Sequence, residues 1–557
     1  MIKEKYNIFL LSDINLDLLY LGLKKNKKIL NNVYKNELND FNLYLFSENI
    51  LNKDFHNSEI LFIWPSIYSI SLEFKKILDY EHFDQKQIES EIINYTNSVK
   101  RLALEKEVLL IPLITFFNDF SDLGIGNMSN SFGKQFFLNK INSIIMRELG
   151  DISNIFLIDP NEIFLNAQKK LDNKLWLKAK IPISIESFEL LSEYIVNALK
   201  TIFLPSKKMI VLDLDNTIWG GILGDDGWNN IKIGGHDYIG EAFLQFQIEI
   251  KKLANIGILL AICSKNNLEF VEEAFHKNNY LHLQLSDFCI IKANWENKAD
   301  NILKIAKEAN ILLNSIVFID DSVHERELVK KLLPDVFVPD FPKDISQLAI
   351  WINKLNCFNA ISLTKEDKTR NKSLKANLEY KNSQITHDQW LKDLKIKIQI
   401  SELLSTDVAR CLQLINKTNQ MNVFTNRYSE KQFKEIISQD QITYFKVIVQ
   451  DKLFPAEVMG VIGIEEDSKS ISLKEFILSC RAFGKNIEHT MFEALKIYSK
   501  YHDKDIKPTS VIPNNKNKVC QTFFKNLSYS NSAKYIMLDN EKIFFKTLHT
   551  KLEFKFK

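Results

Sequence analysis

Short apolar runs, separated by longer amphipathic stretches, make up the first part of the chain. Before residue 205 these runs lie at 8–11, 60–64, 108–114 and 155–158. Runs of this length fit buried strands, and the amphipathic stretches between them fit helices that cross back over a sheet. The pattern therefore predicts an α/β domain with a parallel sheet over residues 1–204.

The same alternation restarts after Pro205. Apolar runs at 209–212, 258–263, 288–291 and 315–319 alternate with helical patterns at 241–254, 268–277 and 299–309. Strands that alternate with helices of this length are typical of a parallel sheet. We therefore expect a second α/β domain, in the centre of the chain, over residues 206–345.

The pattern changes after the central domain. Residues 346–385 include a highly charged stretch with little to bury, and they predict a linker. Residues 386–557 mix helices with antiparallel-looking strands at 443–449, 457–464 and 470–477. This mixture predicts a third, α+β domain, so the chain as a whole is expected to be a multidomain α/β protein.

Composition and charge narrow the class of protein. The 557 residues are 45% hydrophobic and 25% charged, and the apolar runs are too short to cross a bilayer, so we expect no membrane span. With 72 basic and 70 acidic residues the net charge is +2 and no basic stripe stands out, which disfavours nucleic acid as a partner. The six cysteines form no CxxC pair, which fits a reducing cytoplasm and no zinc site.

Two aspartates follow the first strand of the central domain. The segment MIVLDLDNTIWGG places Asp213 and Asp215 at the carboxyl end of the strand, followed by Asn216 and Thr217. Residues two apart on a strand point the same way, so both carboxylates are expected to face one spot. Their mutual repulsion favours a divalent cation there, and oxygen ligands suit Mg²⁺.

Other polar residues follow the neighbouring strands. Asp320 and Asp321 come after the apolar run IVFI and are candidates to complete a metal site, while Ser264 ends the run ILLAIC and can hold phosphate oxygens. A phosphate also calls for a cation. Lys298, at the head of a helix, is one candidate, and Lys292, on the preceding strand, is its rival.

The order of these residues resembles the four signature motifs of the haloacid-dehalogenase (HAD) superfamily. That resemblance implies that Asp213 attacks phosphorus and that Asp215 acts as general acid and base. It further implies that Mg²⁺ is held by Asp213, the backbone carbonyl of Asp215, and Asp320, while Ser264 and Lys298 bind the phosphoryl group. Each of these residues alone is more often a turn cap or a surface residue.

A finer resemblance rests on longer strings. The central domain contains the strings WGGILGDDG, CSKN, NWENK and FIDDSVHERE. These strings, and two segments of the C-terminal domain at 416–428 and 479–488, resemble FkbH-like proteins of HAD subfamily IIIC. The resemblance implies a phosphorylated small-molecule substrate. It implies that the glyceryl group of 1,3-bisphosphoglycerate is loaded, with loss of phosphate, onto the phosphopantetheine thiol of an acyl carrier protein.

The spacing of the central motifs predicts an open site. Ser264 follows Asp213 by 51 positions, which hold a glycine-rich hairpin and one helix and leave no room for a sizeable cap domain. An open site admits a carrier protein. The neighbouring Cys263 could carry an acyl group as a thioester, although a lone cysteine in an apolar strand is more often a small buried core residue.

The flanking domains carry weaker signals. In the C-terminal domain, a predicted helix is preceded by Arg481, Gly484 and Asn486. This arrangement resembles the pyrophosphate loop of GNAT acyltransferases, which implies a surface that handles phosphopantetheine. The alternative is a plain glycine turn before a helix. The N-terminal domain resembles SGNH hydrolases, with Ser12 and Asp13 after the first strand and Asn118 and Asp119 further on. The closing stretch of this domain, LDNKLWLKAKIPIS, lacks the Asp-x-x-His that would activate a serine, so a scaffold or docking role is favoured.

Three classes of function remain open. The first is an acyltransferase that works on a carrier protein, the second a plain phosphohydrolase of glycan or secondary-metabolite biosynthesis, and the third a scaffold without activity. The complete set of charged residues in the central domain disfavours the scaffold, and the open site and C-terminal strings favour acyl transfer.

Overall fold

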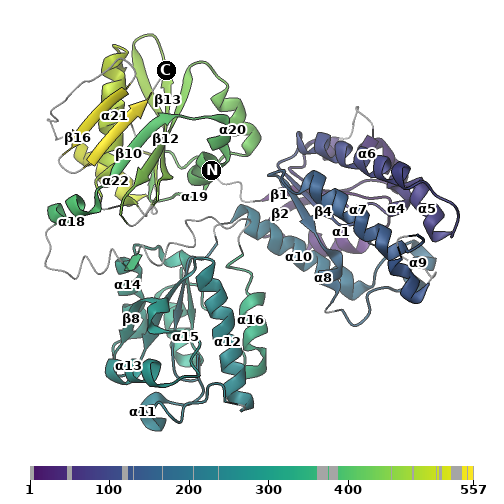
Figure 1. The fold of residues 1–557 in the computed structure, drawn as a ribbon, viewed down its shortest axis with the longest axis horizontal. Coiled ribbons are helices and arrows are strands. Elements are labelled where there is room, and N and C mark those ends of the chain that lie inside the picture. Colours follow the sequence, from purple (N-terminus) through teal and green to yellow (C-terminus); the bar gives the residue numbers. More distant parts are fainter. Residues whose placement is uncertain are drawn as a thin grey trace. The chain divides into compact units, whose positions relative to one another are not determined.

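The computed structural model divides into two compact units, Ile2–Phe203 and Leu204–Lys557 (Figure 1). It describes residues 5–46, 53–115, 123–129, 131–165, 167–204, 206–235, 237–359, 374–375, 387–452, 455–479, 482–483, 485–507, 509, 511–513, 517–527, 542–547 and 550–555. A search of the described helices finds none with the length and apolar character that crossing a bilayer requires.

The N-terminal unit is a parallel sheet with helices on both faces. Its strand order is β2-β1-β3-β4-β5. The strands are β1 (Tyr6–Leu11), β2 (Leu30–Lys35), β3 (Ile60–Ile63), β4 (Val108–Pro112) and β5 (Ile155–Ile158). The helices are α1 (Asp17–Lys24), α2 (Phe41–Phe46), α3 (Lys53–His56), α4 (Ile67–Ile70), α5 (Leu72–Leu78), α6 (Gln85–Ala103), α7 (Lys134–Leu149), α8 (Pro160–Phe164), α9 (Asn173–Ala179) and α10 (Ile185–Phe203).

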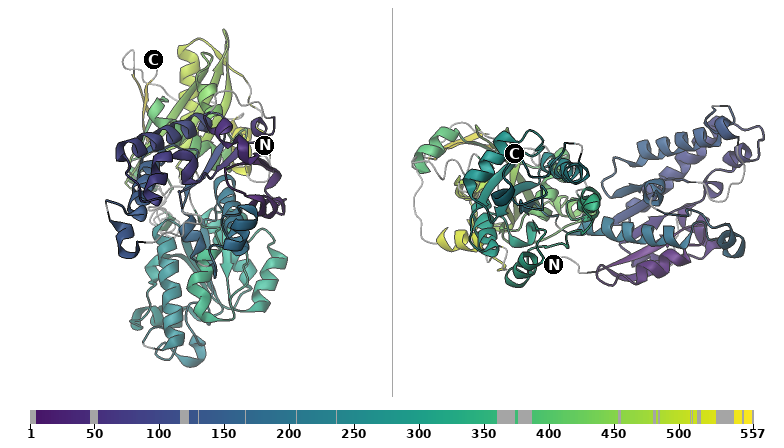
Figure 2. Two further views of the ribbon diagram at one scale, coloured as in Figure 1. Left: turned by 90° about the vertical axis from the view of Figure 1, so that its right-hand side faces the viewer. Right: turned by 90° about the horizontal axis from the view of Figure 1, so that it is seen from below.

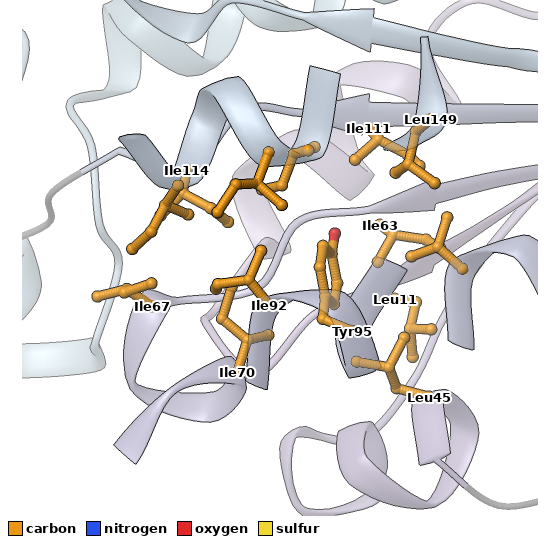
Figure 3. Packing of buried hydrophobic residues seen from close by; sticks show 14 of the residues in the cluster. Leu11, Leu45, Ile63, Ile67, Ile70, Ile92, Tyr95, Ile111, Ile114 and Leu149 are labelled. Atoms are coloured by element: carbon orange, nitrogen blue, oxygen red, sulfur yellow. The ribbon is translucent and has the colours of Figure 1, made fainter. Parts of the chain in front are cut away.

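Each face of this sheet has its own hydrophobic core. Helices α5, α6 and α7 bury one face, and α1, α8 and α10 bury the other, as the views in Figure 2 show. Figure 3 shows part of the first core, where Tyr95 of α6 lies among Leu11, Ile63 and Ile111 of three strands. A sheet buried on both faces explains why its central strands are continuous apolar runs.

The second unit begins with the central parallel sheet, in the order β8-β7-β6-β9. Its strands are β6 (Met209–Leu212), β7 (Leu259–Ser264), β8 (Phe288–Ala293) and β9 (Ile316–Ile319). The helices are α11 (Leu223–Asp226), α12 (Tyr238–Asn255), α13 (Leu268–Lys277), α14 (Lys298–Ala309), α15 (Val323–Leu332) and α16 (Leu348–Lys354). Each strand lies within two residues of its predicted bounds.

The core of this central sheet extends beyond the expected end of the domain at residue 345. Leu348 and Ile352 of α16, and Phe358 after it, are buried in the same cluster as the strands. Of the predicted linker, residues 360–385 lie outside the described part of the chain apart from Leu374 and Lys375.

The C-terminal region is built on a mainly antiparallel sheet in the order β11-β14-β13-β12-β10-β17-β16, with β15 beside β14. The strands are β10 (Lys397–Glu402), β11 (Met421–Asn422), β12 (Ile442–Gln450), β13 (Glu457–Glu466), β14 (Ser470–Leu478), β15 (Asp505–Ile506), β16 (Lys542–Thr547) and β17 (Thr550–Lys555). The helices are α18 (His387–Leu394), α19 (Val408–Lys417), α20 (Glu430–Ile437), α21 (Ile487–Tyr501) and α22 (Lys518–Leu527). Helices α21 and α22 cover one face, and α19 and α20 the other (Figure 1).

Candidate active site

The candidate site lies at the carboxyl edge of the central sheet, where β6 and β9 end side by side. Leu212 is paired with Ile319 in the parallel register, and the Asp213 amide donates to the Ile319 carbonyl at 3.0 Å. The residues that follow these two strands are Asp213 and Asp320. The register therefore places two acidic residues next to each other by the backbone alone.

Three carboxylates and one ammonium group form the centre of the site. Oxygen atoms of Asp213, Asp320 and Asp321 lie within 4.8 Å of one another and could hold a metal ion. The Lys298 Nζ lies 2.9 Å from Asp213 Oδ1 and 2.6 Å from Asp320 Oδ2. Lys298, Asp213 and Asp320 are all nearly inaccessible to solvent. A buried lysine between two buried aspartates compensates part of their charge, and a divalent cation would compensate the rest.

Burial sets the protonation behaviour of these groups. Removal from water raises the pKa of Asp213 to about 6, against the opposing effect of Lys298 and with a further rise from Asp320. Burial likewise raises the pKa of Asp320 and of Asp321. Burial alone would lower the pKa of Lys298, but Asp213 and Asp320 outweigh it and the pKa is raised. The lysine is therefore charged at neutral pH.

Local hydrogen bonds fix the backbone around the carboxylates. Asn297 caps α14 by accepting from the Ala299 amide at 2.8 Å, which fixes Lys298 in the first turn of the helix. On the β9 side, Arg326 of α15 donates from Nη1 to the carbonyls of Asp320 and Asp321, at 2.7 and 2.6 Å. A side chain one turn along the helix thus fixes the loop that presents two of the three carboxylates.

The Asp215 carboxylate is not part of the cluster formed by Asp213, Asp320 and Asp321, and it has hydrogen-bond donors of its own. Its Oδ1 accepts from Trp219 Nε1 and from the Leu223 amide, both at 3.0 Å, and its Oδ2 accepts from Asn266 Nδ2 at 2.9 Å. Strand β6 ends at Leu212 and the chain then turns, so the two-residue period of a strand no longer applies.

Asn266 is a site residue that the sequence analysis missed. Besides Asp215, its amide reaches Ser264 Oγ at 3.1 Å, and the Ser264 hydroxyl in turn interacts with the Asp213 carboxylate. Asn266 thereby connects the two aspartates of the DxD motif. Asn266 is the last residue of the string CSKN, two positions after Ser264.

The two residues after the DxD motif shape the turn. Asn216 has a left-handed backbone, with φ of 51°, and accepts from the Gly221 amide at 2.9 Å, so it closes the loop. The Thr217 hydroxyl accepts from the Asp321 amide at 3.1 Å. The structure thus places Thr217 between the β6 and β9 loops, beside the candidate metal ligands, and Asn216 further out.

Of the two candidate lysines, Lys298 is the one that contacts Asp213. Lys292, on β8, instead forms an ion pair with Glu308 of α14 at 2.7 Å. Cys263 is completely buried in the apolar cluster beneath the sheet, and burial raises the pKa of its thiol to about 12. A buried thiol with so high a pKa is poorly suited to carry an acyl group, so the structure favours the buried-core alternative.

The candidate residues of the N-terminal unit form no hydrolase site within the part that is described. The Ser12 hydroxyl is buried and donates to the Trp64 carbonyl at 2.6 Å. Asp13 accepts from the hydroxyls of Ser66 and Ser69. Asn118 and Asp119 lie outside the described residues.

In the C-terminal domain, Arg481 and Gly484 also lie outside the described residues. Asn486, next to them, has a left-handed backbone with φ of 57° and immediately precedes α21. The predicted pyrophosphate loop therefore stays a prediction.

Comparison with known proteins adds one informative likeness. No family model and no curated protein sequence matches the chain. The N-terminal part of the protein BF1531 from Bacteroides fragilis, which contains a phosphatase domain and was solved with Mg, is 28% identical, with a TM-score of 0.55. The match covers 64% of this chain and 95% of that chain.

Two further structures have much lower TM-scores. A Trypanosoma brucei acetyltransferase is 11% identical with a TM-score of 0.19, covering 26% of this chain and 99% of that one. A lipase from a goat rumen metagenome is 12% identical with a TM-score of 0.24, covering 35% of this chain and 97% of that one. The likeness to BF1531 shows that the chain contains a domain similar to a phosphatase domain that was solved with Mg, and the acidic cluster of Asp213, Asp320 and Asp321 could hold a metal ion.

Proposed function

We propose that the central domain is a Mg²⁺-dependent phosphoryl-group enzyme. The observation that carries the proposal is the buried group of Asp213, Asp320 and Lys298 at a strand end, with Asp321 close enough to share a metal ion. Carboxylates of this kind suit Mg²⁺, which prefers oxygen ligands and is usually held by one or two carboxylates together with water and substrate phosphate. The bound ion would neutralise phosphate charge that Lys298 alone cannot balance.

In this proposal the Asp213 carboxylate attacks phosphorus. An aspartyl-phosphate forms on Asp213, and the bond between phosphorus and the leaving oxygen breaks. Asp215 protonates the leaving oxygen and then takes a proton from the water that releases phosphate and restores Asp213. Asn266 and Trp219 hold the Asp215 carboxylate in place for both proton transfers.

We further propose that the substrate is an acyl phosphate such as 1,3-bisphosphoglycerate, and that the acyl acceptor is an acyl carrier protein. Transfer then breaks a different bond from hydrolysis. The phosphopantetheine thiol attacks the acyl carbon, the bond from that carbon to the phosphate oxygen breaks, and a thioester and inorganic phosphate form. Asp215 is the candidate base for the thiol proton. The motif strings around Asp213, Ser264, Lys298 and Asp320 support this finer proposal.

Intact-mass spectrometry tests the proposal. A holo acyl carrier protein is incubated with the enzyme, Mg²⁺ and enzymatically generated 1,3-bisphosphoglycerate, and inorganic phosphate is measured in the same samples. A glyceryl mass gain that is lost in Asp213→Asn and after chelation is the expected result. Phosphate release without an acylated carrier would leave the phosphohydrolase alternative, and neither product, with acetyl phosphate also left intact, would leave the scaffold.

A further inference from the structure

A glutamate is buried in the C-terminal sheet, on the strand next to the edge strand β11 and far along the chain from the DxD motif. Glu475 of β14 has no solvent-exposed surface. It is paired with Gly463 of β13, which is in turn paired with Tyr444 of β12. A Cβ atom at Gly463 would lie 2.7 Å from the Tyr444 ring, so the glycine lets that ring lie over the central strand.

An irregularity in β14 brings Glu475 to this face. Gly463 is paired with Glu475, but the next residue, Ile464, is paired with Leu473, so Lys474 is extra. In a regular strand Glu475 would share the face of Leu473, which packs in the core under α21. The bulge instead turns it toward the side of Tyr444, which packs under α19 and α20. Bulges that re-aim a side chain are frequent at functional sites.

Among the described residues, one oxygen of this carboxylate has hydrogen-bond donors and the other has none. Glu475 Oε1 accepts from Asn426 Nδ2 at 2.9 Å and from the Tyr428 hydroxyl at 2.7 Å. Glu475 Oε2 is buried and, among the described residues, has no hydrogen-bond partner. A buried oxygen without a partner is costly, and such exceptions call for an explanation.

Tyr428, which donates to the carboxylate, belongs to a cluster of three aromatic rings on this face. Tyr428 is stacked with Phe433 of α20, with ring centroids 6.0 Å apart, and Phe433 meets Tyr444 edge to face at 5.1 Å. Asn426 and Tyr428 are partly exposed, so Glu475 lies one residue below the surface. The guanidinium of the nearby Arg427 donates its hydrogen bonds to backbone carbonyls and to Asn419, and it acts on Glu475 only through its charge among the described residues.

We propose that Glu475, with Tyr428, Phe433 and Tyr444, forms a second ligand site that binds a primary ammonium group. An ammonium group supplies N–H donors to Oε2, balances the buried negative charge and is attracted to the faces of aromatic rings. A neutral hydroxyl would satisfy the first of these three requirements alone. The site lies within the C-terminal domain and is independent of the proposed phosphoryl chemistry.

Ligand-observed saturation-transfer NMR on the full-length protein tests this proposal with two cations. Ethylammonium chloride is the probe, and tetramethylammonium chloride at the same concentration has the same charge but no N–H donor. Saturation transfer to the ethyl protons, and a signal at least several-fold weaker for tetramethylammonium, is the expected result. Equal signals would overturn the proposal, because they would show cation attraction without a hydrogen bond to Glu475.

Two variants locate the site. Glu475→Gln keeps the shape and the Oε1 acceptor, and it is expected to abolish the ethylammonium signal. Glu465→Gln, at a partly exposed position on β13, is the matched control and should retain the signal. Circular dichroism checks that both variants are folded. An undiminished signal in folded Glu475→Gln would place the cation elsewhere.

Discussion

Replacement of Lys298 by methionine tests the electrostatics of the candidate active site most directly. Methionine keeps much of the length and the apolar stem but removes the charge that lies 2.9 Å from Asp213 and 2.6 Å from Asp320. Removing one partner of a buried ion pair costs about 3–5 kcal/mol, because the remaining charges are left buried. For a domain of roughly 150 residues, each kcal/mol lowers the melting temperature by about 2–4 °C. The central domain should therefore melt roughly 10 °C lower.

Magnesium should reverse much of this loss. A ligand present at about 100 times its Kd stabilises the folded state by about 2.7 kcal/mol. The two aspartates lack their counter-ion in Lys298→Met, so the gain from Mg²⁺ should be larger in the variant than in the wild type. Without metal, the variant should also regain stability as the pH falls toward 5. The pKa of Asp213 is already raised to about 6 by burial, and protonation then removes the uncompensated charge.

Calorimetry of the full-length chain, with chelator and with Mg²⁺, measures these shifts. Lys292→Met is the matched control, because its ion pair with Glu308 is partly exposed and is worth about 0–1 kcal/mol. If Lys298→Met shifts the metal-sensitive transition no more than Lys292→Met does, the buried ion pairs do not carry the stability assigned to them.

Three further substitutions give distinct readouts. Asn266→Ala removes a hydrogen bond to a charged acceptor and should lower kcat/KM about 10- to 100-fold with the fold retained; an unchanged rate would show that Asn266 does not position Asp215. Cys263→Ala should retain acyl transfer in the mass assay, because burial raises the pKa of this thiol to about 12, and loss of transfer in a folded variant would revive the thioester hypothesis. Burial raises the pKa of Glu475, so this residue destabilises the fold increasingly as the pH rises above its unfolded pKa. In chemical unfolding, Glu475→Gln should therefore be more stable than the wild type at pH 8 and equally stable near pH 4. The same stability difference between variant and wild type at both pH values would contradict this.

The parallel sheets could be predicted because their strands are buried on both faces. β6 and β9 read as apolar runs that end at aspartates, so both the strands and the acidic edge followed from the sequence. β2 was missed because it is an edge strand, and only Leu30 and Val33 of its six residues are buried. A continuous apolar run identifies a strand only where both faces of the strand are covered.

Side-chain direction was harder to predict than position. The sequence placed Asp213 and Asp215 at one strand end, but the turn after Leu212 aims the second carboxylate at Trp219. The same limit applies to Glu475, which appears in the sequence as one more charged residue of an antiparallel strand. A single extra residue in the bulge decides which face it occupies, and the hydrophobic pattern does not reveal such a bulge.

The contact between Arg326 and the backbone of Asp320 and Asp321 has a consequence for the speed of metal uptake. Because these carbonyls are fixed by the following helix, two of the three carboxylates stand in place before any ion arrives. Metal capture then requires no slow rearrangement of the loop. In a stopped-flow experiment the uptake should follow a single exponential whose rate rises linearly with metal concentration, and Arg326→Leu should add a second phase independent of that concentration.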